Sequence, residues 1–326
     1  MTLHATTTDL RGQDFLTLAD LSPDQLRCLL DRASQLKAMQ ANGQPHPLLA
    51  GLSLAMLFEK ASLRTRTTFM VGMSQLGGFA VDLMNEHTQI GVRESIPDIA
   101  RNLERWVDAL MARVYAHRTL EELAAWADIP VINGLSDLTH PCQALADVLT
   151  MREHLGGLVG RRLAYVGDGF NVCNSLLFAG ALAGMQVRVA SPEGYEPDDD
   201  ILERAQEIAD DAGGGIEIGN DPESAVNNAQ VVYTDAWVSM GLEHEAAERR
   251  EIFAPFCVDN HMMAMAGPDA IFMHCLPAHR GEEVTDAVLD GPQSVVFDQA
   301  ENRLHTQKAL LVAIMRGDAA FDELGA

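Results

Sequence analysis

The stretch LSLAMLFEKASLRTRTTFMVGMSQLGGFAVDL, residues 52–83, contains the unit from which the fold is inferred. An apolar run over 52–58 predicts a buried strand, and the residues after it place Phe69, Met73 and Leu76 on one helix face. Gly77 and Gly78 end that helix, and 79–83 predicts a second strand. A strand, a helix and another strand in this order favour parallel pairing of the two strands.

The same alternation continues along the chain in two series, separated by the glycines of segment 156–160. We therefore predict an α/β fold of two domains, each a parallel β-sheet flanked by helices, with the functional site in the cleft between them. The predicted domains are 1–150 and 151–305, and the last helix, about 306–326, packs back on the first domain. Further strands are predicted at 109–114, 130–133, 163–166, 186–190, 215–218, 231–234, 271–274 and 295–297, and further helices at 18–40, 96–107, 120–126, 176–182 and 306–316.

The chain of 326 residues has 23 basic and 47 acidic residues, which gives a formal net charge of −24. This balance disfavours a nucleic acid or an anionic membrane surface as partner, and it makes capture of an anion depend on a local cluster of positive side chains. The lack of an apolar run of ~20 residues and of a secretory layout at the N-terminus predicts a cytoplasmic protein. Five cysteines without CxxC spacing predict neither a disulfide framework nor a zinc site.

The sequence SLRTR, Ser62 to Arg66, lies between a predicted strand and a predicted helix. The Ser62 hydroxyl and the first backbone N–H groups of such a helix bind anions, and the helix dipole adds to the attraction. Arg64 and Arg66 add guanidinium groups whose geometry matches phosphate oxygens. The segment therefore predicts a phosphate site, and the alternative is an N-capped helix with two solvated arginines.

HPCQ, His140 to Gln143, places two polar side chains on one face at the start of a predicted helix. The positive end of a helix disfavours imidazolium, so His140 is predicted to be neutral. A neutral imidazole donates one hydrogen bond to a carbonyl oxygen that becomes negative during attack. The alternative is a capping histidine packed in the core.

Gly167-Asp168-Gly169 resembles a dinucleotide-binding turn, but no third glycine follows it and no acidic residue ends the next strand. The pattern therefore argues against a nicotinamide cofactor. Asn171 remains available as a polar ligand at the carboxyl end of a strand.

DAWVSMG, residues 235–241, and HCLP, residues 274–277, both follow predicted strands, where ligands bind in open α/β sheets. Asp235 suits an ammonium group, Ser239 supplies a small hydroxyl, and Cys275 near Asp235 would be a hydrogen-bonding partner for an incoming amine. The alternatives are a surface turn and a buried thiol. Arg303, in the segment predicted to open the last helix, is either a surface cation or a late member of the anion cluster.

Together, these motifs resemble the aspartate/ornithine transcarbamylase family over nearly the whole chain. SLRTR is similar to the family's Ser-Thr-Arg-Thr-Arg phosphate loop, with Leu63 at a position that contributes mainly backbone. HPCQ is shared across the family, whereas SMG after an aspartate and HCLP followed by AHRGEE are similar to the ornithine branch. The segment Thr88 to Gly91 resembles the loop that reaches into a neighbouring subunit's site.

The resemblance implies transfer of the carbamoyl group of carbamoyl phosphate to the side-chain amine of L-ornithine, giving L-citrulline and phosphate, without metal or organic cofactor. It implies a homotrimer or an assembly of trimers, with Gln89 donated to the adjacent subunit. The implied catalytic residues are Arg113, His140, Asp235 and Cys275. The implied carbamoyl phosphate ligands are Ser62, Leu63, Arg64, Thr65, Gln89, Arg113, His140, Gln143, Cys275, Leu276 and Arg303, with Arg66 supporting the loop, and the implied ornithine ligands are Asn171, Asp235, Ser239 and Met240.

Two other interpretations remain open. One is a transcarbamylase with another amine acceptor, such as putrescine or an acylated ornithine, and SMG and HCLP argue against it. The other is an inactive paralogue that only binds or scaffolds, and the retention of a full set of polar site residues argues against it. That set consists of Arg64, Arg113, His140, Asp235 and Arg303. The reaction would serve arginine synthesis or, in reverse, arginine breakdown.

Overall fold

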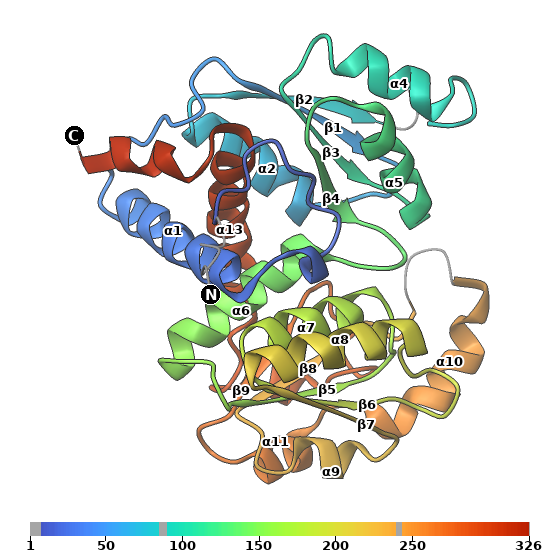
Figure 1. The fold of residues 1–326 in the computed structure, drawn as a ribbon. Helices are drawn as coiled ribbons and strands as arrows, with labels where there is room; N and C mark the ends of the chain where they lie inside the picture. The colour runs from blue at the N-terminus through green and yellow to red at the C-terminus, as the bar shows by residue number, and fades with distance from the viewer. Residues whose placement is uncertain (1–7, 85–89, 239–242, 326) are drawn as a thin grey trace, which may run out of the picture.

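The computed structural model describes residues 8–84, 90–238 and 243–325 of the chain. The described residues form two α/β units, each built on a parallel sheet with helices packed on it (Figure 1). This arrangement confirms the fold class that the alternation of strands and helices predicted. Among these described residues, no helix is both long enough and apolar enough to cross a membrane.

The first sheet has four parallel strands in the order β2-β1-β3-β4. Every residue of the central strand β3 is buried, as expected for a strand with neighbours on both sides. Phe58 at the end of β1 pairs with Arg113 at the end of β3, so the loop after β1 begins next to Arg113. The strands are β1 Ser53–Phe58, β2 Phe79–Met84, β3 Ala109–Arg113 and β4 Val131–Leu135.

The second sheet has five parallel strands in the order β7-β6-β5-β8-β9. Thr234 ends β8 and pairs with His274, which ends β9. Asp235 and Cys275 therefore leave two neighbouring strands at the same edge of the sheet. The strands are β5 Arg162–Val166, β6 Gln186–Ala190, β7 Gly215–Gly219, β8 Val231–Thr234 and β9 Ile271–His274.

Local capping sets the ends of several helices. Ser22 and Gln25 form a reciprocal capping box at the start of α1. Gly77 follows α2 at a φ of +78°, and a Cβ there would lie 2.9 Å from the Cβ of Pro47, so glycine is required. The helices before β9 are α1 Pro23–Ala41, α2 Arg64–Gln75, α4 Ile96–Leu103, α5 His117–Trp126, α6 Pro141–Leu155, α7 Asn171–Leu182, α8 Asp199–Ala212, α9 Pro222–Val226, α10 Ala246–Phe253 and α11 Asn260–Ala266.

The prediction of a strand at 295–297 is wrong, because helix α13, Val296–Arg316, begins there. Three apolar residues carry no period that separates a strand from the first turn of a helix. Arg303 therefore lies inside α13, whereas the sequence pattern placed it at the start of a shorter helix. The remaining short elements are α12 Asp286–Leu289 and the 3₁₀ turns Leu18–Asp20, Glu243–Glu245, Ala254–Phe256 and Asp318–Gly325.

Helix α13 packs against α1, α2 and α6, and it also contacts β9 of the second sheet (Figure 1). Two of its cations are fully buried. Lys308 donates hydrogen bonds to the side-chain oxygens of Gln40 and Gln75 at 2.8 and 2.9 Å, and burial lowers its pKa to about 8. Arg303 extends from the same helix into the cavity described next.

Candidate active site

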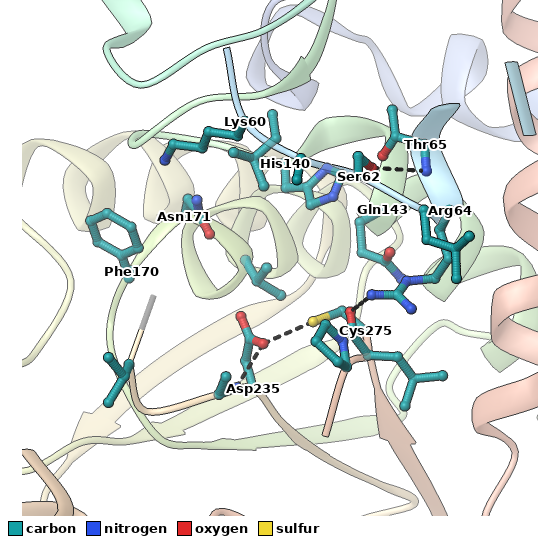
Figure 2. A pocket seen from close by; sticks show the side chains of 18 of the residues that line it. Lys60, Ser62, Arg64, Thr65, His140, Gln143, Phe170, Asn171, Asp235 and Cys275 are labelled. Carbon is teal, nitrogen blue, oxygen red and sulfur yellow. Dashed lines mark hydrogen bonds between the residues drawn. The ribbon is translucent and has the colours of Figure 1, made fainter. Parts of the chain in front are cut away.

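A cavity of about 680 Å³ lies where the carboxyl ends of strands from both sheets approach each other (Figure 2). Residues that follow β1 and end β3 and β4 line it from the first unit, and residues that follow β8 and β9 line it from the second. Three predicted site residues, Gln89, Ser239 and Met240, lie outside the described residues. The other predicted residues all line the cavity, and they are Ser62, Leu63, Arg64, Thr65, Arg113, His140, Gln143, Asn171, Asp235, Cys275, Leu276 and Arg303.

The loop after β1 is fixed at the start of α2. The Ser62 hydroxyl accepts a hydrogen bond from the backbone N–H of Thr65 at 3.2 Å. The Arg64 guanidinium points toward the second unit and donates to the carbonyl oxygen of Leu276 (Figure 2). The loop therefore brings its donors to the cavity and joins the two sides of it.

The two remaining loop residues have different surroundings. The Arg66 guanidinium does not line the cavity, because it pairs with Asp82 at 2.7 Å and stacks on the Phe58 ring at 4.5 Å. The side chain of Leu63 is 76% exposed and has no polar atom, so the backbone N–H is the only group that Leu63 can offer to an anion. These positions suit a supporting part for Arg66 and a backbone contribution from Leu63.

Three arginines from three elements, Arg64 of α2, Arg113 of β3 and Arg303 of α13, converge on the cavity. Burial lowers the pKa of Arg113 to about 9, and the positive charges of Arg303 and Arg64 contribute to this shift. The Nε atoms of Arg113 and Arg303 are buried and have no hydrogen-bond partner among the described residues. Buried cations that repel one another and keep donors free form a strong site for a phosphate group.

His140 is the N-cap residue of α6, and its backbone N–H donates to the Ser175 hydroxyl at 2.7 Å. Burial lowers the pKa of the imidazole well below its ordinary value, and the charges of Arg303 and Arg113 lower it further. The principal cause is therefore burial, whereas the sequence pattern had suggested the helix end. The Nδ1 atom is buried without a partner among the described residues, so a neutral His140 has donor capacity left for a ligand.

The second unit supplies a thiol and a carboxylate to the cavity. The Cys275 thiol donates to Asp235 Oδ1 at 2.8 Å (Figure 2). Burial and the charge of Asp235 raise the pKa of Cys275 well above its ordinary value, so the thiol stays protonated and is not a thiolate nucleophile. Asn171, the first residue of α7, donates to the Ser136 carbonyl oxygen at 2.7 Å, which orients its amide beside the cavity.

Asp235, His274 and Cys275 place a carboxylate, an imidazole and a thiol within 4.8 Å of one another, as a metal site requires. However, both ring nitrogens of His274 already have partners. His274 Nδ1 accepts from the Leu276 N–H at 2.8 Å, and Nε2 donates to Glu283 Oε1 at 3.1 Å. The group therefore offers at most two free ligand atoms, fewer than the three or four protein ligands usual for zinc.

Several polar residues line the cavity that the sequence patterns did not single out. Arg250 and Glu282 form an ion pair at 3.0 Å, and Lys60 lies over the Tyr115 ring at 4.6 Å. His279 and Glu282 belong to the charged segment AHRGEE after HCLP. The concentration of charged residues there is the sequence feature that could have identified them as site residues. Lys60 follows β1 by two residues and is one of only three lysines in the chain. Its position after a strand and its rarity could have identified it as a candidate site residue.

Two family models match most of the chain. "Aspartate/ornithine carbamoyltransferase, carbamoyl-P binding domain" matches residues 13–153, and "Aspartate/ornithine carbamoyltransferase, Asp/Orn binding domain" matches residues 159–314. Arg64, Arg113 and His140 lie in the first match, and Asp235 and Cys275 lie in the second.

Individual relatives agree with these matches. The chain is 53% identical to an ornithine carbamoyltransferase of Pyrococcus horikoshii over 308 residues, which cover 94% of this chain and 97% of the relative. It is 52% identical to one of Halalkalibacterium halodurans, with coverage of 95% and 97%. The solved structure of ornithine carbamoyltransferase from Pyrococcus furiosus superposes with a TM-score of 0.93 at 53% identity and covers 95% of this chain and 99% of that one.

Proposed function

The chain belongs to the aspartate/ornithine carbamoyltransferase family, and on this premise we propose that it transfers the carbamoyl group of carbamoyl phosphate to the side-chain amine of L-ornithine. The products are L-citrulline and phosphate. The observation that carries the proposal is that the arginine cluster and His140 line the same cavity as the Asp235–Cys275 pair. Relatives at 52–53% identity that bear the name ornithine carbamoyltransferase support the choice of acceptor.

The residues divide into two groups by the substrate they contact. Arg64, Arg113 and Arg303 bind the phosphate together with the Ser62–Thr65 loop, and His140 donates to the carbamoyl oxygen. The neutral amine of ornithine attacks the carbamoyl carbon, the bond from that carbon to the phosphate oxygen breaks, and the proton lost by the amine passes to the leaving phosphate. Asn171, Asp235, Ser239 and Met240 hold the amino acid, while Gln143, Cys275 and Leu276 surround the carbamoyl group.

An assay for citrulline formation from carbamoyl phosphate and L-ornithine tests this function. Putrescine and N-acetylornithine are assayed in parallel, because they represent the other possible acceptors. We expect turnover with ornithine and at least tenfold lower kcat/KM with either alternative. A higher kcat/KM for putrescine or acetylornithine would assign a different acceptor, and no product with any amine would support a binding role only.

Replacement of Asp235 by asparagine is expected to raise the ornithine KM about 10- to 100-fold, because an ion pair with the substrate ammonium group is lost. The carbamoyl phosphate KM should change less than threefold, since the arginine cluster is intact. Steady-state kinetics with each substrate varied in turn measure both values. Asp259→Asn is a matched control, because Asp259 caps the distant helix α11. Equal effects on the two KM values would place Asp235 outside the amino-acid site.

We also propose that the protein works as a homotrimer or an assembly of trimers in the cytoplasm, with domains 1–150 and 151–305 and the end of the chain packed on the first. Exposed apolar side chains of the first unit support an interface there. Leu63, Val71 and Phe79, on or next to α2 and β2, are each more than a third exposed. The sequence from Thr88 to Gly91 resembles the family loop that reaches into a neighbouring subunit's site, and on that ground we propose that Gln89 serves the adjacent subunit.

Mixing two inactive variants is expected to restore activity if the site is shared. Arg64→Ala and Gln89→Ala assemblies should each be crippled, because every site lacks one group. In any mixed ring, cyclic symmetry creates an interface where an intact Arg64 faces an intact Gln89. The variants are unfolded, reassembled together or separately, and assayed. Verified mixed assemblies without recovered activity would show that Gln89 does not act across subunits.

A further inference from the structure

Asp147 lies on α6 one turn after Gln143 and is completely buried. Its Oδ1 atom accepts hydrogen bonds from Gln143 Nε2 at 2.8 Å and from Gln299 Nε2 at 2.7 Å, and its Oδ2 atom accepts from the Tyr233 hydroxyl at 3.1 Å. Burial raises the pKa of this carboxyl group to about 7, so keeping it ionised here is costly. All three donors are neutral, so no positive charge among them offsets the free-energy cost of burying the Asp147 carboxylate. A buried carboxylate with this cost calls for a functional explanation.

Gln143 is held between two groups of opposite hydrogen-bonding character. Its Nε2 atom donates to Asp147, and its Oε1 atom accepts from Arg303 Nη1 at 2.6 Å. A guanidinium can only donate, and Asp147 Oδ1, which faces the NH₂ groups of both Gln143 and Gln299, accepts from both. The Gln143 amide therefore fits in one orientation, because a flipped amide would place its oxygen against Asp147 and its NH₂ group against Arg303.

This orientation decides what Gln143 offers to a ligand in the cavity. The amide oxygen has two lone pairs, and Arg303 occupies one of them. The second lone pair can accept from an NH₂ group of a ligand. A carbamoyl group carries such an NH₂ group, whereas an acetyl group has a methyl in its place.

We propose that Asp147 is a positioning residue that fixes the amide of Gln143, and that it thereby makes the cavity select carbamoyl phosphate over acetyl phosphate. The proposal rests on the proposed function and adds a specificity determinant to it. Asp147 does not line the cavity, so its effect passes through Gln143.

Two stable ligands separate this effect from general loss of structure. Phosphonoacetamide and 2-oxopropylphosphonate share a phosphonate and a carbonyl group, and they differ in bearing NH₂ or CH₃ on the carbonyl carbon. Their dissociation constants are measured by calorimetry for the wild-type protein and the Asp147→Leu variant, in which leucine fills the carboxylate's space. We expect the wild type to bind phosphonoacetamide more tightly than 2-oxopropylphosphonate. In the variant, the ratio of the two dissociation constants should fall about 3- to 10-fold, which corresponds to the loss of one hydrogen bond.

Two further variants show whether the effect runs through Gln143. In a Gln143→Ala background, the change Asp147→Leu should not alter the preference any more, because the amide it orients is absent. Tyr233→Phe removes the hydrogen bond to the other carboxylate oxygen and leaves Gln143 in place. Tyr233→Phe should lower the melting temperature without changing the preference for phosphonoacetamide. If Asp147 had only a structural role, Tyr233→Phe and Asp147→Leu would both lower the melting temperature and the preference together.

The outcomes are distinct for the inference and for the proposed function. Equal binding of the two ligands by the wild type, an unchanged preference in Asp147→Leu, or an equal loss in Tyr233→Phe would each overturn the inference. Failure of both Asp147→Leu and Asp147→Ala to fold would assign the carboxylate to stability alone and would also overturn it. The proposed function is tested separately by citrulline formation in the wild type, which does not depend on these ratios.

Discussion

Replacement of His140 by alanine is expected to lower turnover about 10²- to 10³-fold, the usual effect of removing one donor to a developing oxyanion. The carbamoyl oxygen becomes more negative as the amine attacks, so a hydrogen bond donated there stabilises the transition state more than the bound substrate. Burial and the neighbouring arginines keep the imidazole neutral. It therefore donates without needing to be protonated, and affinity for phosphonoacetamide should change only a few-fold.

Two measurements make the His140 prediction specific. His154 lies at the other end of the same helix, beside Asp298, and His154→Ala should keep turnover within about twofold of wild type. Because the pKa of His140 lies well below its ordinary value, protonation of this group should not reduce kcat between pH 8 and 6.5. A His140→Ala variant with near wild-type turnover, or one that only weakens binding, would exclude the assigned part in the chemistry.

The strands of the second sheet show what local sequence can predict. Segments 186–190, 231–234 and 271–274 were predicted with the bounds that the structure has. Segments 231–234 and 271–274 are short, fully buried runs made mostly of apolar residues, as expected for strands inside a parallel sheet. Segment 186–190 instead alternates polar and apolar residues, and its Gln186 and Arg188 are only partly buried. Segment 295–297 is also apolar, yet it leads into α13, a helix of 21 residues that packs against α1, α2 and α6, elements far away in the sequence.

The same distinction applies to the site. Asp235 and Cys275 were predictable because each directly follows a strand, and Ser62 because it lies in the loop between β1 and α2; the carboxyl ends of parallel strands carry ligand sites. Arg303 and Asp147 follow no strand. Both are buried where α13 packs against α6, and the sequence leaves such a charge open to a surface interpretation. Burial of a charge is a property of the tertiary structure, so the pattern of residues around it does not reveal it.

Replacement of Arg113 by methionine is expected to stabilise the free protein and to abolish tight binding of carbamoyl phosphate. Burial lowers the pKa of this guanidinium to about 9, and repulsion by the positive charges of Arg303 and Arg64 contributes to the shift. Methionine has a similar length and no charge, so it removes both penalties and should raise the free energy of unfolding by about 1–3 kcal/mol. Loss of a buried, charge-assisted contact to the phosphate should cost about 2–4 kcal/mol in binding, or roughly 30- to 1000-fold in Kd.

A gain in stability together with a loss of ligand affinity distinguishes an arginine that binds the ligand from one that supports the fold. Chemical unfolding without ligand gives the stability, and calorimetry with phosphonoacetamide gives the affinity. Arg105→Met is the matched control, because the Arg105 side chain is 76% exposed, and it should change stability by no more than about 0.5 kcal/mol and leave the affinity unaltered. Addition of the phosphonate should raise the melting temperature of wild type and Arg105→Met but not of Arg113→Met. An Arg113→Met protein that is less stable than wild type and binds the phosphonate equally well would show that the arginine supports the fold instead of the phosphate.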